Sequence, residues 1–520
     1  MLIADDLLLD YKRCQRRAFL NLYGDRTERD PERDFVSKLR SQGSQHIAAV
    51  LADYDYYVPR FARGDWDAGA IATARLMAQG VDCIHHGVLQ VNRFHPLPAH
   101  LWPSAIANTP PNPQILAVEA RLRLQALELR GKPTLLVKQP GKSRWGDWQY
   151  IPISVKLGKR PKPEYKLVSA LHTYLLAVMQ EALPREAHLI LRDRDVHSVH
   201  LNIWLPRLWE VLAECSEVLL LSREPEIFIS RQRCSLCQWY SHCNAIAQSQ
   251  NHLSLVPGVT PNRYEQLQTL GIQTLETLAS TPPQQLKSTL GSDLALNLQQ
   301  QAWSIVSNQA LKKHTKWALP PLPSGEVEFY FDIEAEPDRN LDYLLGVMRV
   351  DYRPVPLRGS LRDREQFIPL VAENPAAEAD IWQQFLTLME SEPNAPIFHF
   401  SEYEVETIQR LGRLYKTPLN RIQALVSRCV DLHHYVTATT ILPVQSYSLK
   451  SVAQWLGFQW RDAEASGDQT VCWYDSWLKT GDRDSLNAII RYNEDDCRAT
   501  YCLKVWLADF LESPIAAVNQ

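Results

Sequence analysis

VEFYFDIE, residues 327–334, is the stretch of sequence that decides the fold of the C-terminal part of the chain. Its apolar side chains alternate with the others, which is the period of a β-strand, where successive side chains point to opposite faces. We therefore expect Asp332 and Glu334 to lie together on the face opposite Phe331 and Ile333. Carboxylates that share one strand face can bridge a pair of metal ions, so this stretch predicts a metal-binding strand.

A second acidic stretch, RYNEDDC at residues 491–497, lies about 160 residues later and precedes a strongly helical tail. On a helix, the i,i+4 spacing places Tyr492 and Asp496 on one face. A tyrosine hydroxyl one turn away from a metal-binding carboxylate can orient an attacking water molecule. Asp495 is a rival for the carboxylate, but only Asp496 keeps this spacing to the tyrosine.

Together these stretches resemble the DEDD 3′–5′ exonucleases of the tyrosine subclass, and specifically the RNase H-like exonuclease domain that some RecB-like nucleases carry at their C-terminus. Residues 331–334 are similar to the first motif of that family, and Tyr492-x3-Asp496 is similar to the last. The resemblance also covers residues 431–432 and 448–452. It implies a divalent-metal-dependent phosphodiester hydrolase.

The chain departs from the family in the second motif, which usually supplies an aspartate after an asparagine. Here the sequence is HFSEYE at residues 399–404, and we expect Glu404 to be the third carboxylate, with Glu402 as the runner-up. Glutamate is one methylene longer than aspartate, which changes the metal geometry. The resemblance implies that Tyr492 holds the attacking water. It also implies that two Mg²⁺ or Mn²⁺ ions are bound by Asp332, Glu334, Glu404 and Asp496.

Four cysteines form a second constellation. Cys234, Cys237 and Cys243 follow the spacing C-x2-C-x5-C, and Cys14 lies alone in the basic stretch KRCQRR near the N-terminus. Four thiolates can close a cubane iron–sulfur cluster or a tetrahedral metal site, so the trio needs a remote fourth ligand. Cys14 is the best-placed candidate. Spacing alone leaves iron and zinc open.

This arrangement, an early cysteine, a long domain and a late cysteine trio, resembles the iron–sulfur RecB-like nucleases of the PD-(D/E)XK superfamily, including the CRISPR-associated exonucleases. The resemblance implies a [4Fe–4S] cluster, with structural zinc as the alternative. The expected ligands are Cys14, Cys234, Cys237 and Cys243.

The metal-binding core of this second family is degenerate in the chain. Thr134 stands at the position of the family's aspartate, Ser154 at that of its glutamate and Ala170 at that of its glutamine. Lys156 and Tyr174 are kept. Magnesium requires anionic oxygen ligands, and neutral hydroxyls do not replace them. We therefore expect an inactive nuclease domain, in which Glu119 could supply one carboxylate.

Two segments are candidates for nucleic-acid binding. Residues 156–166, KLGKRPKPEYK, suit phosphate contacts, although a solvated basic loop explains them almost as well. The contacts expected there are Lys156, Lys159, Arg160 and Lys162. Residues 256–275 resemble a helix-hairpin-helix module, whose hairpin N–H groups would bind a DNA phosphate, or else a helical packing spacer.

At 520 residues the chain is too long for a single core, and we expect an α/β multi-domain protein. Apolar segments at 115–129, 134–138 and 149–155 predict strands, and 167–181 predicts a helix. The expected domains are a degenerate RecB-like domain, a helix-hairpin-helix-like module and an RNase H-like DEDD exonuclease domain. Their bounds are 1–248, 249–318 and 324–520.

These features predict a cytoplasmic protein without a membrane span, because no apolar run approaches the length needed for one. The net charge of −4 leaves nucleic-acid binding to local basic patches. We expect a 3′–5′ exonuclease of DNA repair or recombination that binds single-stranded DNA or 3′ ends, with a helicase as a further partner. A catalytically inactive nucleic-acid-binding scaffold and an RNA-processing exonuclease are the alternatives.

Overall fold

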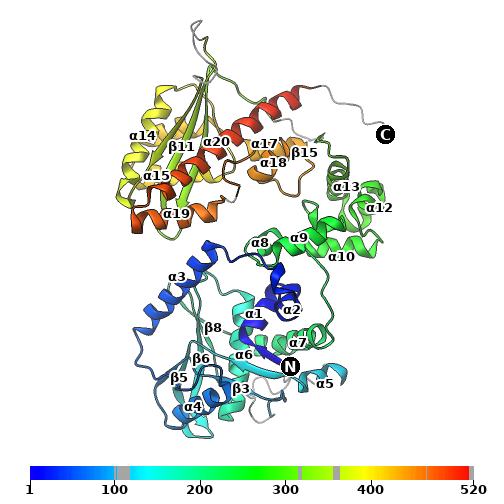
Figure 1. The fold of residues 1–520 in the computed structure, drawn as a ribbon, viewed down its shortest axis with the longest axis vertical. Coiled ribbons are helices and arrows are strands. Elements are labelled where there is room, and N and C mark those ends of the chain that lie inside the picture. Colours follow the sequence, from blue (N-terminus) through cyan, green and yellow to red (C-terminus); the bar gives the residue numbers. More distant parts are fainter. Residues whose placement is uncertain (99–100, 102–117, 314–318, 355–363, 464, 514–520) are drawn as a thin grey trace. The chain divides into compact units, whose positions relative to one another are not determined.

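The computed structural model describes the chain except for residues 99–100, 102–117, 314–318, 355–363, 464 and 514–520. The chain divides into two compact units, Met1–Ala245 and Ile246–Gln520 (Figure 1). Both units combine helices with β-sheets, so the prediction of a mixed α/β protein of several domains is confirmed.

A five-stranded sheet forms the centre of the first unit. In spatial order its strands are β2 (Cys83–His85), β5 (Leu135–Ser143), β6 (Gly146–Val155), β7 (His188–Ile190) and β8 (Val196–Ser198). Neighbouring strands are antiparallel except for β6 and β7. Helix α6 (Pro163–Gln180) packs on one face of the sheet and α3 (Asp34–Leu51) on the other.

A smaller sheet joins the start of the chain to this unit. Strand β1 (Leu2–Ala4) pairs in parallel with β4 (Glu128–Gly131), which pairs with β3 (Leu89–Val91). Helices α1 (Asp5–Arg13) and α2 (Gln15–Tyr23) follow β1 and meet at the residue between them, Cys14.

The strand predicted at 115–129 is wrong over most of its length. Residues 118–125 form helix α5 (Val118–Gln125), and residues 115–117 lie outside the described residues. The helix packs against α7 (Leu201–Leu220), where Leu124 is buried and Arg123 pairs with Glu217 at 3.2 Å. Tertiary packing here overrides a local apolar pattern. The other predicted elements, at 134–138, 149–155 and 167–181, coincide with β5, β6 and α6.

The second unit begins with short helices. These are α10 (Pro261–Thr269), α11 (Leu275–Ser280), α12 (Pro283–Leu290) and α13 (Ser292–Ser307). Thr274 and Thr277 form a capping box that starts α11. Gln301 of α13 accepts a hydrogen bond from the hydroxyl of Tyr447 at 2.8 Å and donates to the carbonyl of Leu442 at 2.5 Å. The helical segment therefore packs against the C-terminal part of its own unit.

That C-terminal part contains a second five-stranded sheet. In spatial order the strands are β12 (Glu365–Val371), β11 (Leu341–Asp351), β10 (Val327–Glu336), β13 (Ile397–His399) and β14 (Cys429–Asp431). Strand β10 is central, antiparallel to β11 and parallel to β13. The predicted metal-binding strand is therefore the middle strand of this sheet.

Helices cover both faces of this sheet (Figure 1). One core holds Phe331 and Ile333 of β10 against α14 (Glu378–Ser391), α15 (Tyr403–Leu414) and α16 (Leu419–Val426). A second core holds Tyr330 against three other helices. These are α17 (Leu432–Thr439), α18 (Leu449–Trp455) and the later part of α20 (Arg483–Glu512).

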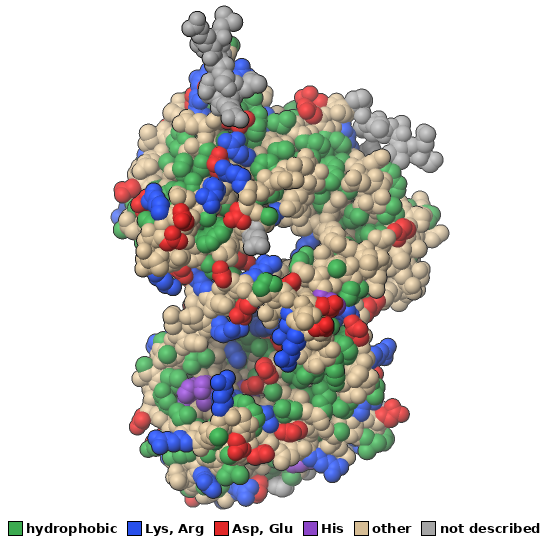
Figure 2. Space-filling view, in the orientation of Figure 1, with side chains coloured by type: hydrophobic (Ala, Val, Ile, Leu, Met, Phe, Trp, Pro, Cys, Tyr) green, Lys and Arg blue, Asp and Glu red, His purple; other side chains and the backbone are tan. Residues whose placement is uncertain are grey.

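Charged side chains of both signs are interspersed on the visible face of each unit (Figure 2). Within the described part of the chain, no helix combines the length and the apolar character that crossing a membrane requires.

Candidate active site

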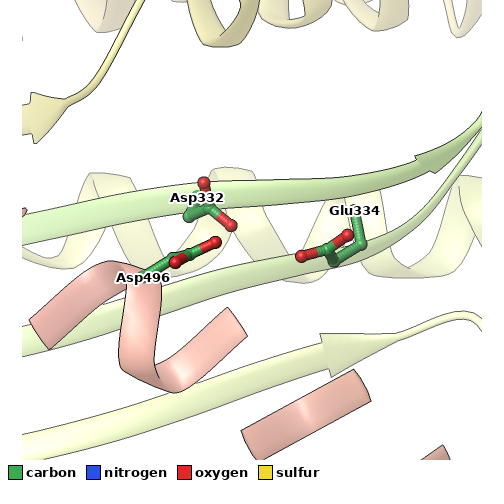
Figure 3. Close-up of side chains that lie close together, drawn as sticks. All are labelled: Asp332, Glu334 and Asp496. Carbon is green, nitrogen blue, oxygen red and sulfur yellow. The ribbon is translucent and has the colours of Figure 1, made fainter. Parts of the chain in front are cut away.

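Three carboxylates converge in the second unit. Asp332 and Glu334 project from β10, and Asp496 projects from α20 toward them (Figure 3). Each of the three residues contributes one carboxylate oxygen, and these three oxygens all lie within 4.8 Å of one another. Among the described residues this is the one group of three or more acidic, histidine or cysteine side chains that approach so closely. Glu334 is buried, while part of Asp332 and of Asp496 reaches solvent.

Backbone geometry brings α20 close to the strands. Asp332 lies opposite Gly346 of β11, and the register shifts between Glu334 and Ala335. A Cβ atom at Gly346 would lie 1.5 Å from the side-chain amide oxygen of Asn493, so a larger residue at this position would displace the Asn493 side chain. The missing side chain lets the helix place Asn493 against the strand that carries Asp332.

Each carboxylate accepts hydrogen bonds from neutral side-chain donors. The Asn493 amide donates to Asp332 at 2.7 Å, and the Thr470 hydroxyl donates to Glu334 at 2.7 Å. The indole N–H of Trp460 donates to Asp496 at 2.8 Å. In the described part of the chain, none of the three carboxylates forms an ion pair with lysine or arginine. The donors therefore fix the orientation of the acids without neutralising their charge.

Burial and mutual repulsion raise the pKa values of these acids. Burial and then the charge of Asp496 raise the pKa of Glu334 to about 8. Burial also raises the pKa of Asp496 to about 7, against the hydrogen bond from Trp460. The pKa of Asp332 rises well above its ordinary value through burial and three neighbouring carboxylates. These carboxylates resist ionisation when no metal is bound, because their negative charges are buried close together. A divalent cation would supply the compensating positive charge, so the cluster is suited to bind one.

The structure turns Glu404 inward and Glu402 outward. Glu404 is 4% exposed, accepts a hydrogen bond from the Ser401 hydroxyl at 3.1 Å and lies 3.4 Å from the ring of His399. It is close enough to raise the pKa of Asp332, yet it lies outside the group of three. Ser401 has a φ of 131°, a strained backbone conformation of the kind that clusters at functional sites.

Tyr492 lies beside the carboxylates, and its hydroxyl is hydrogen-bonded to Asp496. Burial, followed by the three nearby carboxylates, raises its pKa far above the ordinary value, so the hydroxyl keeps its proton. The rival acid, Asp495, is occupied elsewhere, because the guanidinium of Arg461 binds it at 2.8 Å.

Sequence reasoning did not identify the donors Asn493, Thr470 and Trp460. Asn493 follows Tyr492 directly, and its place inside the last motif was the available signal. Trp460 and Thr470 belong to a loop and to α19 (Gly467–Thr480), and no spacing relates them to the acids. Sequence reasoning also did not identify Lys450, whose positive charge lowers the pKa of Asp496.

The four cysteines of the first unit lie close together. Cys14 caps the start of α2, and Cys234 ends α8 (Arg231–Cys234). Cys243 lies in α9 (Tyr240–Ser249), six residues after Cys237. Burial raises the pKa of the three later thiols, and each also responds to the charge of Cys14. All four are free of disulfides.

The degenerate motif residues occupy hydrogen-bonded positions in the first unit. The Thr134 hydroxyl accepts from the amide of Val155 at 3.0 Å. Tyr174 donates from the core to the carbonyl of His95 at 2.8 Å, and Ala170 is buried. Glu119 is exposed on α5, apart from these residues.

Sequence reasoning missed one carboxylate near Ser154 and Lys156, that of Asp5. Asp5 accepts from the backbone amide of Lys132 at 3.0 Å and lies 3.1 Å from the ring of His172. The other ring nitrogen of His172 lies 3.4 Å from the hydroxyl of Ser154. Burial lowers the pKa of Lys156, and the charge of Asp5 opposes this shift. Asp5 is the first residue of α1, and no motif indicated that this segment contributes to the site.

The segments predicted to bind nucleic acid are only partly open. Lys159, Arg160 and Lys162 are exposed in the loop after β6, whereas Lys156 is partly buried. In the segment predicted as a hairpin, Gly258 has a φ of 92°, and its carbonyl accepts from the side chain of Arg263 at 2.6 Å.

Comparison with known proteins supports the C-terminal part of this description. Residues 329–508, about a third of the chain, match the RNase_H superfamily. This segment contains β10, the later strands and most of α20. No curated protein matches the chain.

The C-terminal domain is therefore RNase H-like, which indicates a nuclease-type, nucleic-acid-hydrolysing function. Nucleases of this kind use divalent metals such as Mg²⁺, and the acidic cluster provides ligands for them.

Proposed function

We propose that the protein is a divalent-metal-dependent 3′–5′ exonuclease of the DEDD type that acts on DNA in repair or recombination. The observation that carries the proposal is the convergence of Asp332, Glu334 and Asp496 inside an RNase H-like domain. Glu404 completes the acidic set from the start of α15. Bound at this cluster, two Mg²⁺ or Mn²⁺ ions would supply a water of lowered pKa and charge stabilisation for the leaving 3′ oxygen.

The chain's own residues would then orient the reactants. Asn493, Thr470 and Trp460 each donate to an oxygen of one carboxylate and so fix the orientation of the three acids for ligand binding. The protonated hydroxyl of Tyr492 lies next to Asp496 and would position the attacking water in line with the phosphodiester. Burial of Glu334 and partial burial of Asp332 and Asp496 strengthen the attraction of these carboxylates for a cation.

In this proposal residues 1–248 form an inactive RecB-like domain, 249–318 a helix-hairpin-helix-like module and 324–520 the exonuclease domain. Inactivity of the first is supported by Thr134 and Ser154, which offer neutral hydroxyls already engaged in hydrogen bonds. Asp5 is likewise engaged, by His172 and the amide of Lys132. The exposed residues Lys159, Arg160 and Lys162 would bind DNA phosphates, with a helicase as a further partner.

For the cysteines we propose a [4Fe–4S] cluster. A tetrahedral zinc site with Zn–S distances of about 2.3 Å holds its sulfurs roughly 4 Å apart. No three of the four sulfurs, which all belong to described residues, lie within 4.8 Å of one another. This wider spacing favours the larger cubane over zinc. The test is anaerobic absorption and iron content of the protein and of Cys14→Ser, where zinc in place of iron would contradict the proposal.

The test of the exonuclease is cleavage of 5′-labelled single-stranded DNA with Mg²⁺ or Mn²⁺. We expect a shortening ladder from the native chain and from Lys156→Ala, and none from Asp332→Ala. Loss of cleavage in Lys156→Ala alone would place the chemistry in the first unit and contradict the proposal.

The alternative is a scaffold that binds nucleic acid without hydrolysing it. It is favoured by one observation, the position of Glu404 outside the group of three carboxylates. Tight DNA binding with no cleavage in either metal would establish the scaffold.

A further inference from the structure

Lys450 lies near the start of α18, in the stretch at 448–452 that resembles the exonuclease family. Its ammonium group donates to the carbonyl of Ala463 at 3.2 Å and to the carbonyl of Ala465 at 2.9 Å. Both carbonyls belong to the connection between α18 and α19. Because an ammonium group has three donors, this one side chain fixes the connection at two points.

The same connection carries Trp460, which contacts the acidic cluster. The indole N–H of Trp460 donates to Asp496 at 2.8 Å, and the tryptophan is buried. The ammonium nitrogen of Lys450 lies 5.8 Å from the centroid of the indole ring, within the range of a cation–π interaction. Lys450 therefore holds the indole directly, through its ring, and also through the backbone that follows it.

The indole packs in a small apolar cluster that includes the tyrosine of the last motif. Its buried neighbours are Ala453 and Ala499, and Phe458 and Tyr492 pack against them. The ring of Phe458 meets the indole edge to face, with centroids 4.9 Å apart. A shift of the indole would therefore disturb the surroundings of Tyr492 as well as the hydrogen bond to Asp496.

Arg461 also fastens this connection, but to a different helix. Its backbone amide donates to Asp495 at 2.9 Å, and its guanidinium donates to Asp495 at 2.8 Å and to Glu494 at 2.9 Å. Both acids belong to α20. Arg461 thus ties the connection to α20, whereas Lys450 ties its later part to α18. The contacts of Lys450 are not duplicated by those of Arg461.

The charge of Lys450 by itself would oppose a metal ion at the acidic cluster. When a divalent cation replaces a proton on the carboxylates, the positive charge of the site rises, and a nearby ammonium group disfavours that rise. Loss of the lysine charge should therefore strengthen metal binding. Loss of the contacts that orient a metal-binding carboxylate should weaken it. The two effects have opposite signs, so a measurement of metal affinity separates them.

We propose that Lys450 is a positioning residue of the metal site, which holds Trp460 and, through it, the carboxylate of Asp496 in the orientation that binds a divalent cation. The inference rests on the proposed function, because it requires a metal ion at the acidic cluster. Residues that orient metal ligands without touching the metal contribute roughly ten- to a hundredfold to metal affinity or activity.

The test is Mn²⁺ binding to the full chain without nucleic acid, measured from the electron paramagnetic resonance signal of the free ion. Lys450→Met removes the donors and keeps most of the side-chain length, and it should weaken Mn²⁺ binding about tenfold. Trp460→Phe should weaken binding by a similar factor. In the Trp460→Phe background Lys450→Met should add no more than about twofold, because the indole N–H is already absent.

Lys479→Met is the matched control, because it removes the same charge from an exposed position of the same unit. Lys479 lies in the last turn of α19, about 14 Å along the helix from Thr470, and its variant should bind Mn²⁺ like the native chain. Asp332→Ala identifies the site, since the Mn²⁺ binding that this variant loses belongs to the acidic cluster.

Mn²⁺ binding by Lys450→Met that is as tight as native, or tighter, would overturn the positioning role and leave the exonuclease intact. A lowered melting temperature with native affinity has the same meaning, as does a full tenfold loss in the Trp460→Phe background. If Lys450→Met does not fold, Lys450→Gln, which keeps an N–H donor, should weaken binding several-fold, and native affinity in it would equally overturn the role. A native chain without Mn²⁺ binding that depends on Asp332 would overturn the proposed function together with this inference.

Discussion

Replacing Glu334 with glutamine should make the metal-free protein more stable at neutral pH. In the unfolded chain a glutamate with an ordinary pKa of 4.5 is ionised at pH 7. In the fold, where its pKa is about 8, Glu334 must hold a proton at that pH. A pKa raised by folding lowers the stability as pH rises from the unfolded to the folded value. Glutamine cannot ionise, so the variant does not carry this penalty.

The size of the effect follows from the pKa interval. Between 4.5 and pH 7 the penalty grows by about 1.4 kcal/mol for each pH unit, which gives roughly 3 kcal/mol at pH 7. For a domain of this size, 1 kcal/mol moves the melting temperature by roughly 2–4 °C, so we expect a rise of about 6–12 °C. Glutamine keeps an oxygen that can accept the bond from Thr470, so packing is conserved.

The assay is calorimetry in EDTA at pH 7 and pH 4, with Glu402→Gln as the control because Glu402 is an exposed carboxylate nearby. Glu334→Gln should melt higher than the native chain at pH 7 and at the same temperature at pH 4. Magnesium should raise the melting temperature of the native chain and not that of the variant. A variant that melts at or below the native temperature at pH 7 in EDTA would refute the reasoning, because Glu334 would then stabilise the empty site.

Three further predictions concern neighbouring residues. Gly346→Ala should displace Asn493 from its bond to Asp332, lowering the melting temperature by several degrees and cleavage about a hundredfold; native values in both assays would contradict the close approach. In a gel assay, Glu404→Ala should reduce cleavage about a hundredfold and Glu402→Ala should not; equal rates for the two variants would rule out Glu404 as the third carboxylate. Burial raises the pKa of Asp342 to about 6, so native stability should fall by up to about 3 kcal/mol between pH 4 and pH 7 through this group; urea unfolding should show a flatter pH dependence for Asp342→Asn, and parallel curves would exclude the effect.

Local patterns predicted the parts of the structure that depend on local geometry. The alternation in residues 327–334 indicated the strand that became β10, and the i,i+4 spacing indicated the helical face of Tyr492 and Asp496 in α20. The RNase H-like class of the C-terminal domain is confirmed by the family match. The assignment of catalytic roles to these residues stays a prediction, as do the domain bounds and the cofactor of the cysteines.

Features that depend on distant packing could not be predicted. Nothing in the spacing of Trp460 or Thr470 relates them to the acids they bond, because both arrive through the arrangement of a loop and of α19. The same holds for Asp5, which meets His172 across 167 residues of chain. The apolar pattern that predicted a strand around Leu124 failed because packing against α7 selected a helix.

The distance along the chain between the two halves of the acidic cluster affects when the cluster can form. Asn493 reaches Asp332 across 161 residues, and Asp496 lies on the same helix as Asn493. During synthesis β10 leaves the ribosome long before α20 does, and at 5–20 residues per second this interval is roughly ten to thirty seconds. A nascent or truncated chain therefore carries two of the three clustered carboxylates without the third. The cluster exists only after the rest of the domain has been made.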